Sequence, residues 1–312
     1  MARFQNPHLP HTRRSLWAAF LWWLGHYNDP EEKVHPPTSF VYPAHPSPCD
    51  RTKCHATWIG HSTYFVEMEG IRFLTDPVWG NYCAPVPIPK LKRKCAPPMC
   101  LSDLPRIDFV LLSHNHYDHL DAKVVTYLKR HQPHIEWIVP ERLARWFQRR
   151  GIAKVRELKW WESSAVSALK ITAVPAQHFS GRTLWDKNKT HWNGYAVEGK
   201  NKKLYFTGDT GYNPHDFKAI GKKFQNFDLS LIPIGTYVPR KFMSPVHISP
   251  EQAVQIHQDV GSRLSLGMHW GTFNLSEEPM HAPPYDLYRA MKEKNLPLAT
   301  FLPIPPGTSV NW

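Results

Sequence analysis

Three histidines and one aspartate lie within six consecutive residues of this 312-residue chain, in the order His114, His116, Asp118 and His119. Imidazole nitrogens and carboxylate oxygens together suit zinc, and also iron or manganese. A helix would distribute these side chains around its circumference, whereas a tight loop after a strand can direct them at two neighbouring points. The spacing H-x-H-x-D-H therefore predicts a loop that supplies one pair of ligands to each of two divalent metal ions, with zinc the expected element.

A site for two metal ions needs more than four ligands, so further histidines or aspartates are expected at other strand ends. Three candidates each follow a short apolar run, namely His178, Asp209 and His269. Strand ends that meet at one edge of a sheet form a common rim for a site in other α/β enzymes. Taken alone, a histidine is more often a core or surface residue, and the turn around Asp209 is more often structural. Because the histidine block is present in the same chain, we interpret all three residues as metal ligands.

Short apolar runs separated by turns predict the elements that position these residues. The unbroken apolar run at 109–112 predicts a buried strand that ends directly at the histidine block. The other expected strands lie at 56–59, 64–68, 71–74, 137–139, 169–174, 194–197, 203–206, 229–232 and 264–268. The expected helices lie at 122–130, 141–150, 214–222, 250–259 and 284–294. Strands in both halves, with helices after several of them, predict an α/β fold in which two packed sheets have helices outside, an αββα sandwich.

The first 53 residues differ from the rest in being rich in proline, histidine and tryptophan with little periodicity. They indicate an N-terminal extended arm at 1–53, packed on one catalytic domain at 54–312. Within the arm, the basic and aromatic segment 13–24 is compatible with a membrane interface or with a short helix that caps the domain. No apolar run approaches the roughly 20 residues that span a bilayer. A cytoplasmic protein is expected, with contact at the inner membrane face left open.

The formal net charge of +12 favours acidic partners, such as lipid head groups, nucleic acid or phosphorylated small molecules. No appended nucleic-acid module is recognisable, so nucleic acid is not the expected partner. The odd number of cysteines, five, argues against a complete disulfide framework. The oligomeric state stays open.

The histidine block resembles the hallmark of the metallo-β-lactamase superfamily. Longer stretches resemble the branch of N-acylphosphatidylethanolamine-hydrolysing phospholipases D, at 113–121, 177–178, 182–188, 207–212, 232–240 and 269–273. The resemblance runs from about Cys54 to the C-terminus, roughly four fifths of the chain, and the arm departs from it most. It implies the metallo-β-lactamase form of the αββα sandwich.

The resemblance also implies a role for each site residue. One metal ion would be held by His114, His116 and His178, and the other by Asp118, His119 and His269, with Asp209 as the bridging ligand. The substrate phosphate would face Tyr117 and His247. Asp76 would support the ligand loops through hydrogen bonds.

The expected activity is that of a metal-dependent phosphodiesterase of the phospholipase D type. In this hypothesis Asp118 and Asp209 are the catalytic carboxylates, and a bridging hydroxide attacks the phosphorus of a phospholipid or other anionic phosphodiester. The products would be phosphatidic acid and an N-acylethanolamine. A lactonase or another phosphodiesterase on the same scaffold is an alternative, since many reactions share this fold. A non-catalytic metal-binding protein is the alternative from another class.

Overall fold

Apolar side chains alternate between two cores along the central strands of the molecule. The computed structural model describes residues 2–9, 33 and 35–312. In β4 (Phe109–Leu111), Phe109 and Leu111 pack into the core between two sheets, whereas Val110 packs into a second core on the opposite face. Successive side chains of a strand point to opposite faces, so the unbroken apolar run of the sequence is a strand covered on both sides.

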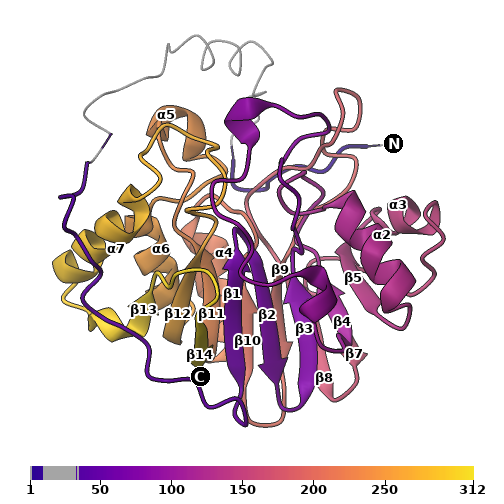
Figure 1. Ribbon diagram of the computed structural model, residues 1–312, viewed down its shortest axis with the longest axis horizontal. Coiled ribbons are helices and arrows are strands. Elements are labelled where there is room, and N and C mark those ends of the chain that lie inside the picture. The colour runs from indigo at the N-terminus through magenta and orange to yellow at the C-terminus, as the bar shows by residue number, and fades with distance from the viewer. Residues whose placement is uncertain (1, 10–32, 34) are drawn as a thin grey trace.

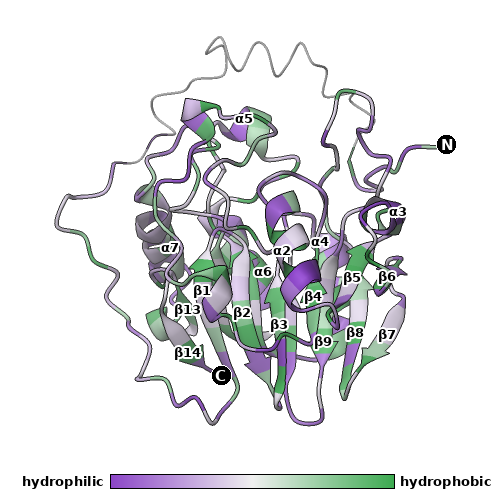
Figure 2. Cartoon of the chain, turned by 45° about the vertical axis from the view of Figure 1, so that its right-hand side comes forward, coloured by the Kyte–Doolittle hydropathy of each residue, from purple (hydrophilic) through white to green (hydrophobic). Residues whose placement is uncertain are grey.

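Two seven-stranded sheets are formed within the described part of the chain (Figure 1). The first has the order β14-β1-β2-β3-β4-β5-β6, with β1 His55–Gly60, β2 Thr63–Met68, β3 Ile71–Thr75, β5 Glu136–Pro140, β6 Val155–Leu158 and β14 Ser309–Asn311. The second has the order β13-β12-β11-β10-β9-β8-β7, with β7 Ser163–Val166, β8 Leu169–Val174, β9 Gly194–Glu198, β10 Lys203–Phe206, β11 Phe227–Pro233, β12 Ser262–Met268 and β13 Phe301–Leu302. The hydrophobic residues, green in Figure 2, concentrate in these strands.

Helices cover the outer faces of both sheets. Their bounds are α2 Ala122–His131, α3 Ala144–Gln148, α4 Pro214–Phe224, α5 Arg240–Met243, α6 Pro250–Asp259 and α7 Ala282–Glu293. Helices α2 and α3 pack on the first sheet, while α4, α6 and α7 pack on the second (Figure 1). The αββα sandwich predicted from the sequence is confirmed.

Strand direction brings the predicted site residues to one edge of the sandwich. In the first sheet, β1 and β3 are both antiparallel to β2, and β4 is parallel to β3. In the second sheet, β8 and β10 are both antiparallel to β9, while β11 and β12 are parallel to β10. The loops that leave β1, β3, β4, β8, β10, β11 and β12 therefore emerge together on the side of α5 (Figure 1). This common edge is called the rim below.

Several elements differ from the sequence-based expectations. The helix predicted at 141–150 begins only at Ala144, because Arg142 has a φ of 67° and interrupts a right-handed helix. The helix predicted at 284–294 begins two residues earlier, since proline is tolerated in a first helical turn. The short strands β6, β7, β13 and β14 were not predicted.

The described parts of the N-terminal arm, residues 2–9, 33 and 35–53, contact the sandwich. The Asn6 side chain donates to the carbonyl of His178 at 2.7 Å, and the Tyr42 hydroxyl donates to the carbonyl of Phe301 at 2.8 Å. The segment 13–24, for which membrane contact or domain capping was considered, lies outside the described residues. The domain boundary at residue 54 stays a prediction. No helix among the described residues is both long and apolar enough to cross a membrane.

Val66→Ala and Val41→Ala form a matched pair that tests the core between the sheets. Val66 in β2 is fully buried, whereas Val41 on the arm is 68% exposed. The Val66 change should lower the free energy of unfolding by about 1.5–3 kcal/mol, because it removes two buried methyl groups and leaves a cavity. The Val41 change should alter it by less than about 0.5 kcal/mol. Equal effects in urea denaturation would contradict the assignment of Val66 to the core.

Candidate metal centre

Three imidazoles meet where β4 and β8 end. His114 and His116 lie on the loop after β4, and His178 lies on the loop after β8. His114 Nε2 lies 2.8 Å and His178 Nε2 lies 3.3 Å from Nδ1 of His116. The structure thus brings together the three histidines that were predicted to share one metal ion, and they are called the first group below.

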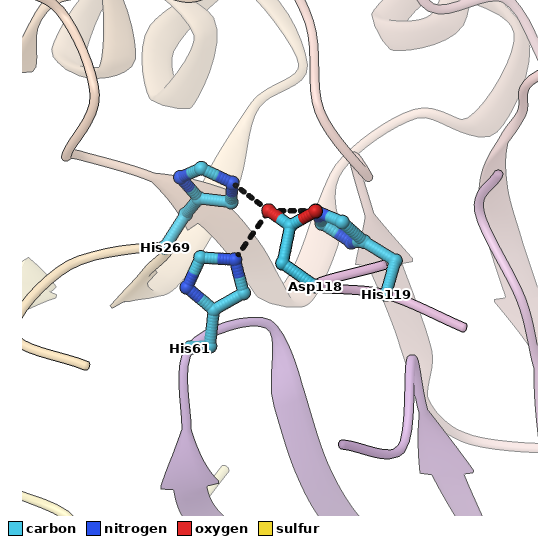
Figure 3. Close-up of side chains that lie close together, drawn as sticks. All are labelled: His61, Asp118, His119 and His269. Atoms are coloured by element: carbon cyan, nitrogen blue, oxygen red, sulfur yellow. Dashed lines mark hydrogen bonds and ion pairs between the residues drawn. The ribbon is translucent and has the colours of Figure 1, made fainter. Parts of the chain in front are cut away.

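Asp118, His119 and His269 also face one another and are called the second group (Figure 3). Oδ2 of Asp118 lies 3.3 Å from Nε2 of His119 and 3.5 Å from Nε2 of His269. Both imidazoles are fully buried, while the Asp118 side chain is 14% exposed. His269 stands at the end of β12 and the other two on the loop after β4, so the second group joins the two sheets.

Asp209, on the loop after β10, lies between the two groups. Its Oδ2 atom is 3.2 Å from His119 Nε2 and 3.0 Å from His269 Nε2 in the second group. The same oxygen is 3.7 Å from Nε2 of His178 in the first group. All seven residues predicted from the sequence as ligands are therefore clustered at the rim.

Some of the buried atoms at the centre of this cluster lack hydrogen bonds. Among the described residues, no hydrogen-bond partner is found for Nε2 of His119, Nε2 of His269 or Oδ1 of Asp209. The two nitrogens are close to Asp209 Oδ2 but do not meet the geometry of a hydrogen bond to it. Buried polar atoms are nearly always paired, so such exceptions need an explanation, for example a bound ion. The donor set fits a cation shared by these atoms.

The ring nitrogen that faces away from the cluster has a partner in four of the histidines. The pairs are His114 Nδ1 with Ser113 Oγ at 2.9 Å, His119 Nδ1 with Asp76 Oδ2 at 2.6 Å, His178 Nδ1 with the Val246 carbonyl at 3.0 Å and His269 Nδ1 with Thr236 Oγ1 at 3.1 Å. Metal-binding histidines almost always use their second nitrogen in this way, which fixes the tautomer and the ring orientation. Nε2 is thereby left to face the cluster.

Asp76, directly after β3, makes three hydrogen bonds to residues of the histidine block and to Ser113 before it. Its Oδ1 accepts from the amide of Ser113 at 2.7 Å, and its Oδ2 accepts from the Ser113 hydroxyl at 2.5 Å. The same Oδ2 holds Nδ1 of His119. Burial raises the pKa of Asp76, although His119 and Ser113 oppose the shift. One buried carboxyl thus fixes both the start of the ligand loop and one of its imidazoles.

The two groups differ in charge before any metal binds. Burial lowers the pKa of His269, but Asp209 and Asp118 outweigh this effect and raise it to about 9. The same carboxylates hold the pKa of His119 well above its ordinary value. In the first group burial dominates and lowers the pKa of His116 to about 4. At neutral pH the metal-free second group therefore carries protons that an entering cation must displace, whereas the first group is neutral.

Arg182 forms hydrogen bonds to the loop that carries the histidine block, which is called the ligand loop below. Its guanidinium donates to the carbonyls of Asn115 at 2.9 Å and Leu120 at 2.8 Å. It also stacks 3.9 Å over the ring of Tyr117, whose hydroxyl donates to the Arg182 carbonyl at 3.0 Å. His247, the other residue implied to face substrate, places Nδ1 4.0 Å from Asp209 Oδ2. Both implied substrate residues thus lie beside the cluster.

Two residues of the site were not predicted from the sequence. His61, in the turn between β1 and β2, places Nε2 2.9 Å from Oδ2 of Asp118 (Figure 3). Glu278 accepts from the consecutive amides of Thr236, Tyr237 and Val238, and so fixes the loop whose Thr236 hydroxyl holds His269. His61 stands two residues after the strand predicted at 56–59, but a single histidine in a turn is a weak signal. Nothing in the sequence distinguished Glu278, which the structure buries, from the other carboxylates of the chain.

The chain is similar to several known proteins. The family model described as the beta-lactamase superfamily domain matches residues 71–270. The N-acyl-phosphatidylethanolamine-hydrolyzing phospholipase D 1 of Caenorhabditis elegans is 43% identical over 76% of this chain and 69% of its own length. The mitochondrial N-acyl-phosphatidylethanolamine-hydrolyzing phospholipase D of Saccharomyces cerevisiae is 36% identical over 73% of this chain and 50% of its own length.

Among solved structures, the metallo hydrolase Igni18 of Ignicoccus hospitalis matches with a TM-score of 0.64 and 22% identity. The match covers 83% of this chain and 98% of that protein, which indicates a shared fold. The chain therefore belongs to the metallo-β-lactamase superfamily of metal-dependent hydrolases, in which it resembles the N-acylphosphatidylethanolamine-hydrolysing phospholipase D branch.

Proposed function

We propose that the chain holds two divalent metal ions at the rim, with zinc the expected element. A tetrahedral zinc ion with bonds of about 2.0–2.1 Å places its ligand atoms about 3.3–3.4 Å apart. In the second group together with Asp209, the measured separations between nitrogen and oxygen donors are 3.0–3.5 Å. In the first group, His116 Nδ1 lies 2.8 and 3.3 Å from its two neighbours. The separations in the second group are close to this spacing, and those in the first group are equal to it or shorter, which supports one ion for each group with Asp209 next to both.

The donor types are consistent with zinc, and iron or manganese remain the alternatives. Five imidazoles and two carboxylates make up the proposed set, and none of its members is a thiolate. Imidazole suits zinc and iron, whereas a larger share of carboxylates would favour manganese. Elemental analysis of the purified protein would identify which of these metals is bound.

Two divalent ions at such a site supply a water molecule that ionises near neutral pH, and they stabilise negative charge on a phosphoryl oxygen. The chain's own residues position this chemistry. Asp209 would keep the two ions together, and Asp76 and Arg182 would hold the ligand loop so that its donors need not reorganise on binding.

We assign a phosphodiester as the substrate, with N-acylphosphatidylethanolamine as the expected compound. Hydrolysis would form a bond between the water oxygen and phosphorus and break the bond from phosphorus to the ethanolamine oxygen. The leaving oxygen would gain a proton, which gives an N-acylethanolamine and phosphatidic acid. His247 and Tyr117 would face the phosphate. The support is the identity to two phospholipases of this name, together with the buried cluster of imidazoles and carboxylates.

A peripheral contact with a membrane fits this substrate, and the loop after β8 is suited to make it. Leu184 and Trp185 are 75% and 76% exposed at its tip. Their loop is fixed at its base, because Asp186 accepts from the amides of Arg182 and Thr183. The hydrogen bonds of the Arg182 guanidinium to the ligand loop place this tip close to that loop. Apolar side chains held outward beside the site would enter the outer part of a lipid layer.

A lactonase or another phosphodiesterase on the same scaffold is the alternative within enzymes. A metal-binding protein without catalysis is the alternative outside them. A hydrolysis screen with N-acylphosphatidylethanolamine, bis-p-nitrophenyl phosphate, lactones and RNA separates these functions. Turnover confined to lactones would contradict the phosphodiester assignment, and turnover of none by fully metal-loaded protein would favour the non-catalytic alternative.

Asp209→Asn should lower turnover of the phosphodiester by at least about 100-fold, because the metal ions contribute several kcal/mol of transition-state stabilisation that this residue organises. Asp228→Asn is the matched control, since Asp228 pairs with Lys202 and Arg263 near the start of β11, at the opposite end of the sheet. It should leave turnover unchanged. Full activity of Asp209→Asn with two metal ions bound would show that this carboxylate does not have the proposed role.

Replacing both Leu184 and Trp185 by serine should weaken binding to vesicles that contain anionic phospholipid by about 10-fold or more, given the apolar area that these side chains can bury. Val41→Ser removes a comparably exposed apolar side chain from the arm and should have little effect. Vesicle sedimentation measures binding, while hydrolysis of soluble bis-p-nitrophenyl phosphate should be unchanged. Unaltered vesicle binding of the double variant would exclude this loop as the contact.

A further inference from the structure

His61 contacts the second group, but its two ring nitrogens differ from those of the proposed ligands. Its Nε2 atom meets hydrogen-bond geometry with Oδ2 of Asp118 at 2.9 Å. By contrast, Nε2 of His119 and Nε2 of His269 have no hydrogen-bond partner among the described residues. An ionised carboxylate can only accept, so Nε2 of His61 carries the ring proton when the imidazole is neutral.

The other nitrogen of His61 supports this assignment. Nδ1 is buried and has no hydrogen-bond partner in the described part of the chain. If His61 bound a metal ion through Nε2, its proton would move to Nδ1 and become a buried donor without an acceptor. Such a group is costly, whereas four of the proposed ligand histidines have a partner at the corresponding atom. The ring is therefore set up to donate from Nε2 and not to bind metal through it.

The backbone of His61 is held tightly at the junction of the two sheets. Its carbonyl accepts from the amide of His269 at 3.0 Å and from Nε1 of Trp58 at 2.9 Å. Its amide donates to the Thr272 hydroxyl at 2.7 Å. The residue adopts a φ of 53°, a left-handed conformation that is unfavourable for a residue with a side chain unless its surroundings impose it.

The ring of His61 is also confined. Its centroid lies 4.0 Å from that of His269 and 5.2 Å from that of Phe273, and its side chain is 1% exposed. Asp118, in contrast, is the most exposed member of the second group, at 14%. The confined imidazole of His61 therefore donates a hydrogen bond to Asp118, the more exposed of the two carboxylates proposed as metal ligands.

We propose that His61 is a positioning residue that orients the Asp118 carboxylate and thereby strengthens metal binding in the second group. The inference rests on the proposed metal centre but not on the identity of the substrate. Hydrogen bonds to metal-binding carboxylates commonly change metal affinity by about 10–100-fold. Loss of the His61 donor should weaken one of the two metal sites and spare the other.

The test compares the stepwise zinc affinities of the intact protein, His61→Ala and His61→Gln by competition with a chromophoric chelator. His61→Ala should weaken one of the two dissociation constants by about 10–100-fold and change the other by less than about threefold. His61→Gln can place an amide N–H near the position of Nε2, so it should recover most of the lost affinity. His257→Ala is the control, because His257 is a buried histidine of α6 whose partner is Ser265, outside the cluster.

His257→Ala should lower thermal stability without changing either zinc affinity. Wild-type affinities in His61→Ala would overturn the inference and leave the metal centre intact. Equal losses in His61→Ala and His61→Gln would also overturn it, since hydrogen-bond donation would not be the property that matters. Absence of zinc binding by the unaltered protein would instead contradict the proposed function itself.

Discussion

The structure depends on keeping two carboxylates, Asp118 and Asp209, among imidazoles at a buried edge of the sandwich. Their pKa values are held well below the ordinary range by His119 and His269, against the opposing effect of burial. Without a cation, protons on His119 and His269 compensate the negative charge of these carboxylates. Buried charge is costly unless it is compensated, so the fold must bring several chain segments together at once.

Both sheets and the loops between them serve this requirement. The first sheet contributes the ligand loop after β4 and its support Asp76, whereas the second contributes His178, Asp209 and His269 from three further strand ends. The two sheets are also joined by a hydrogen bond from the amide of His269 to the carbonyl of His61. Each group takes residues from both sheets, so a shift of one sheet would separate them. The core between the sheets therefore fixes the geometry of the cluster together with the hydrogen bonds around it.

The sequence predicted the αββα layers and all seven clustered residues for physical reasons that can be named. Dense histidines carry a chemical signal, and residues that directly follow apolar runs lie at strand ends, which parallel strands bring to one edge. His61 was missed because a single histidine in a turn carries no such density. Glu278 acts through backbone amides, whose position depends on the fold. Strands such as β6 were missed because their side chains alternate too weakly in polarity, and pairing with a neighbouring strand decides their structure.

The central claim is that two cations share the rim of the sandwich, one in each group and both next to Asp209. Anomalous diffraction from crystals of the metal-loaded protein, recorded on both sides of the zinc absorption edge, tests this most directly. We expect two peaks about 3.5–4 Å apart, one among His114, His116 and His178 and the other beside Asp118, His119 and His269. A single peak, or strong peaks elsewhere with none at the rim, would contradict it.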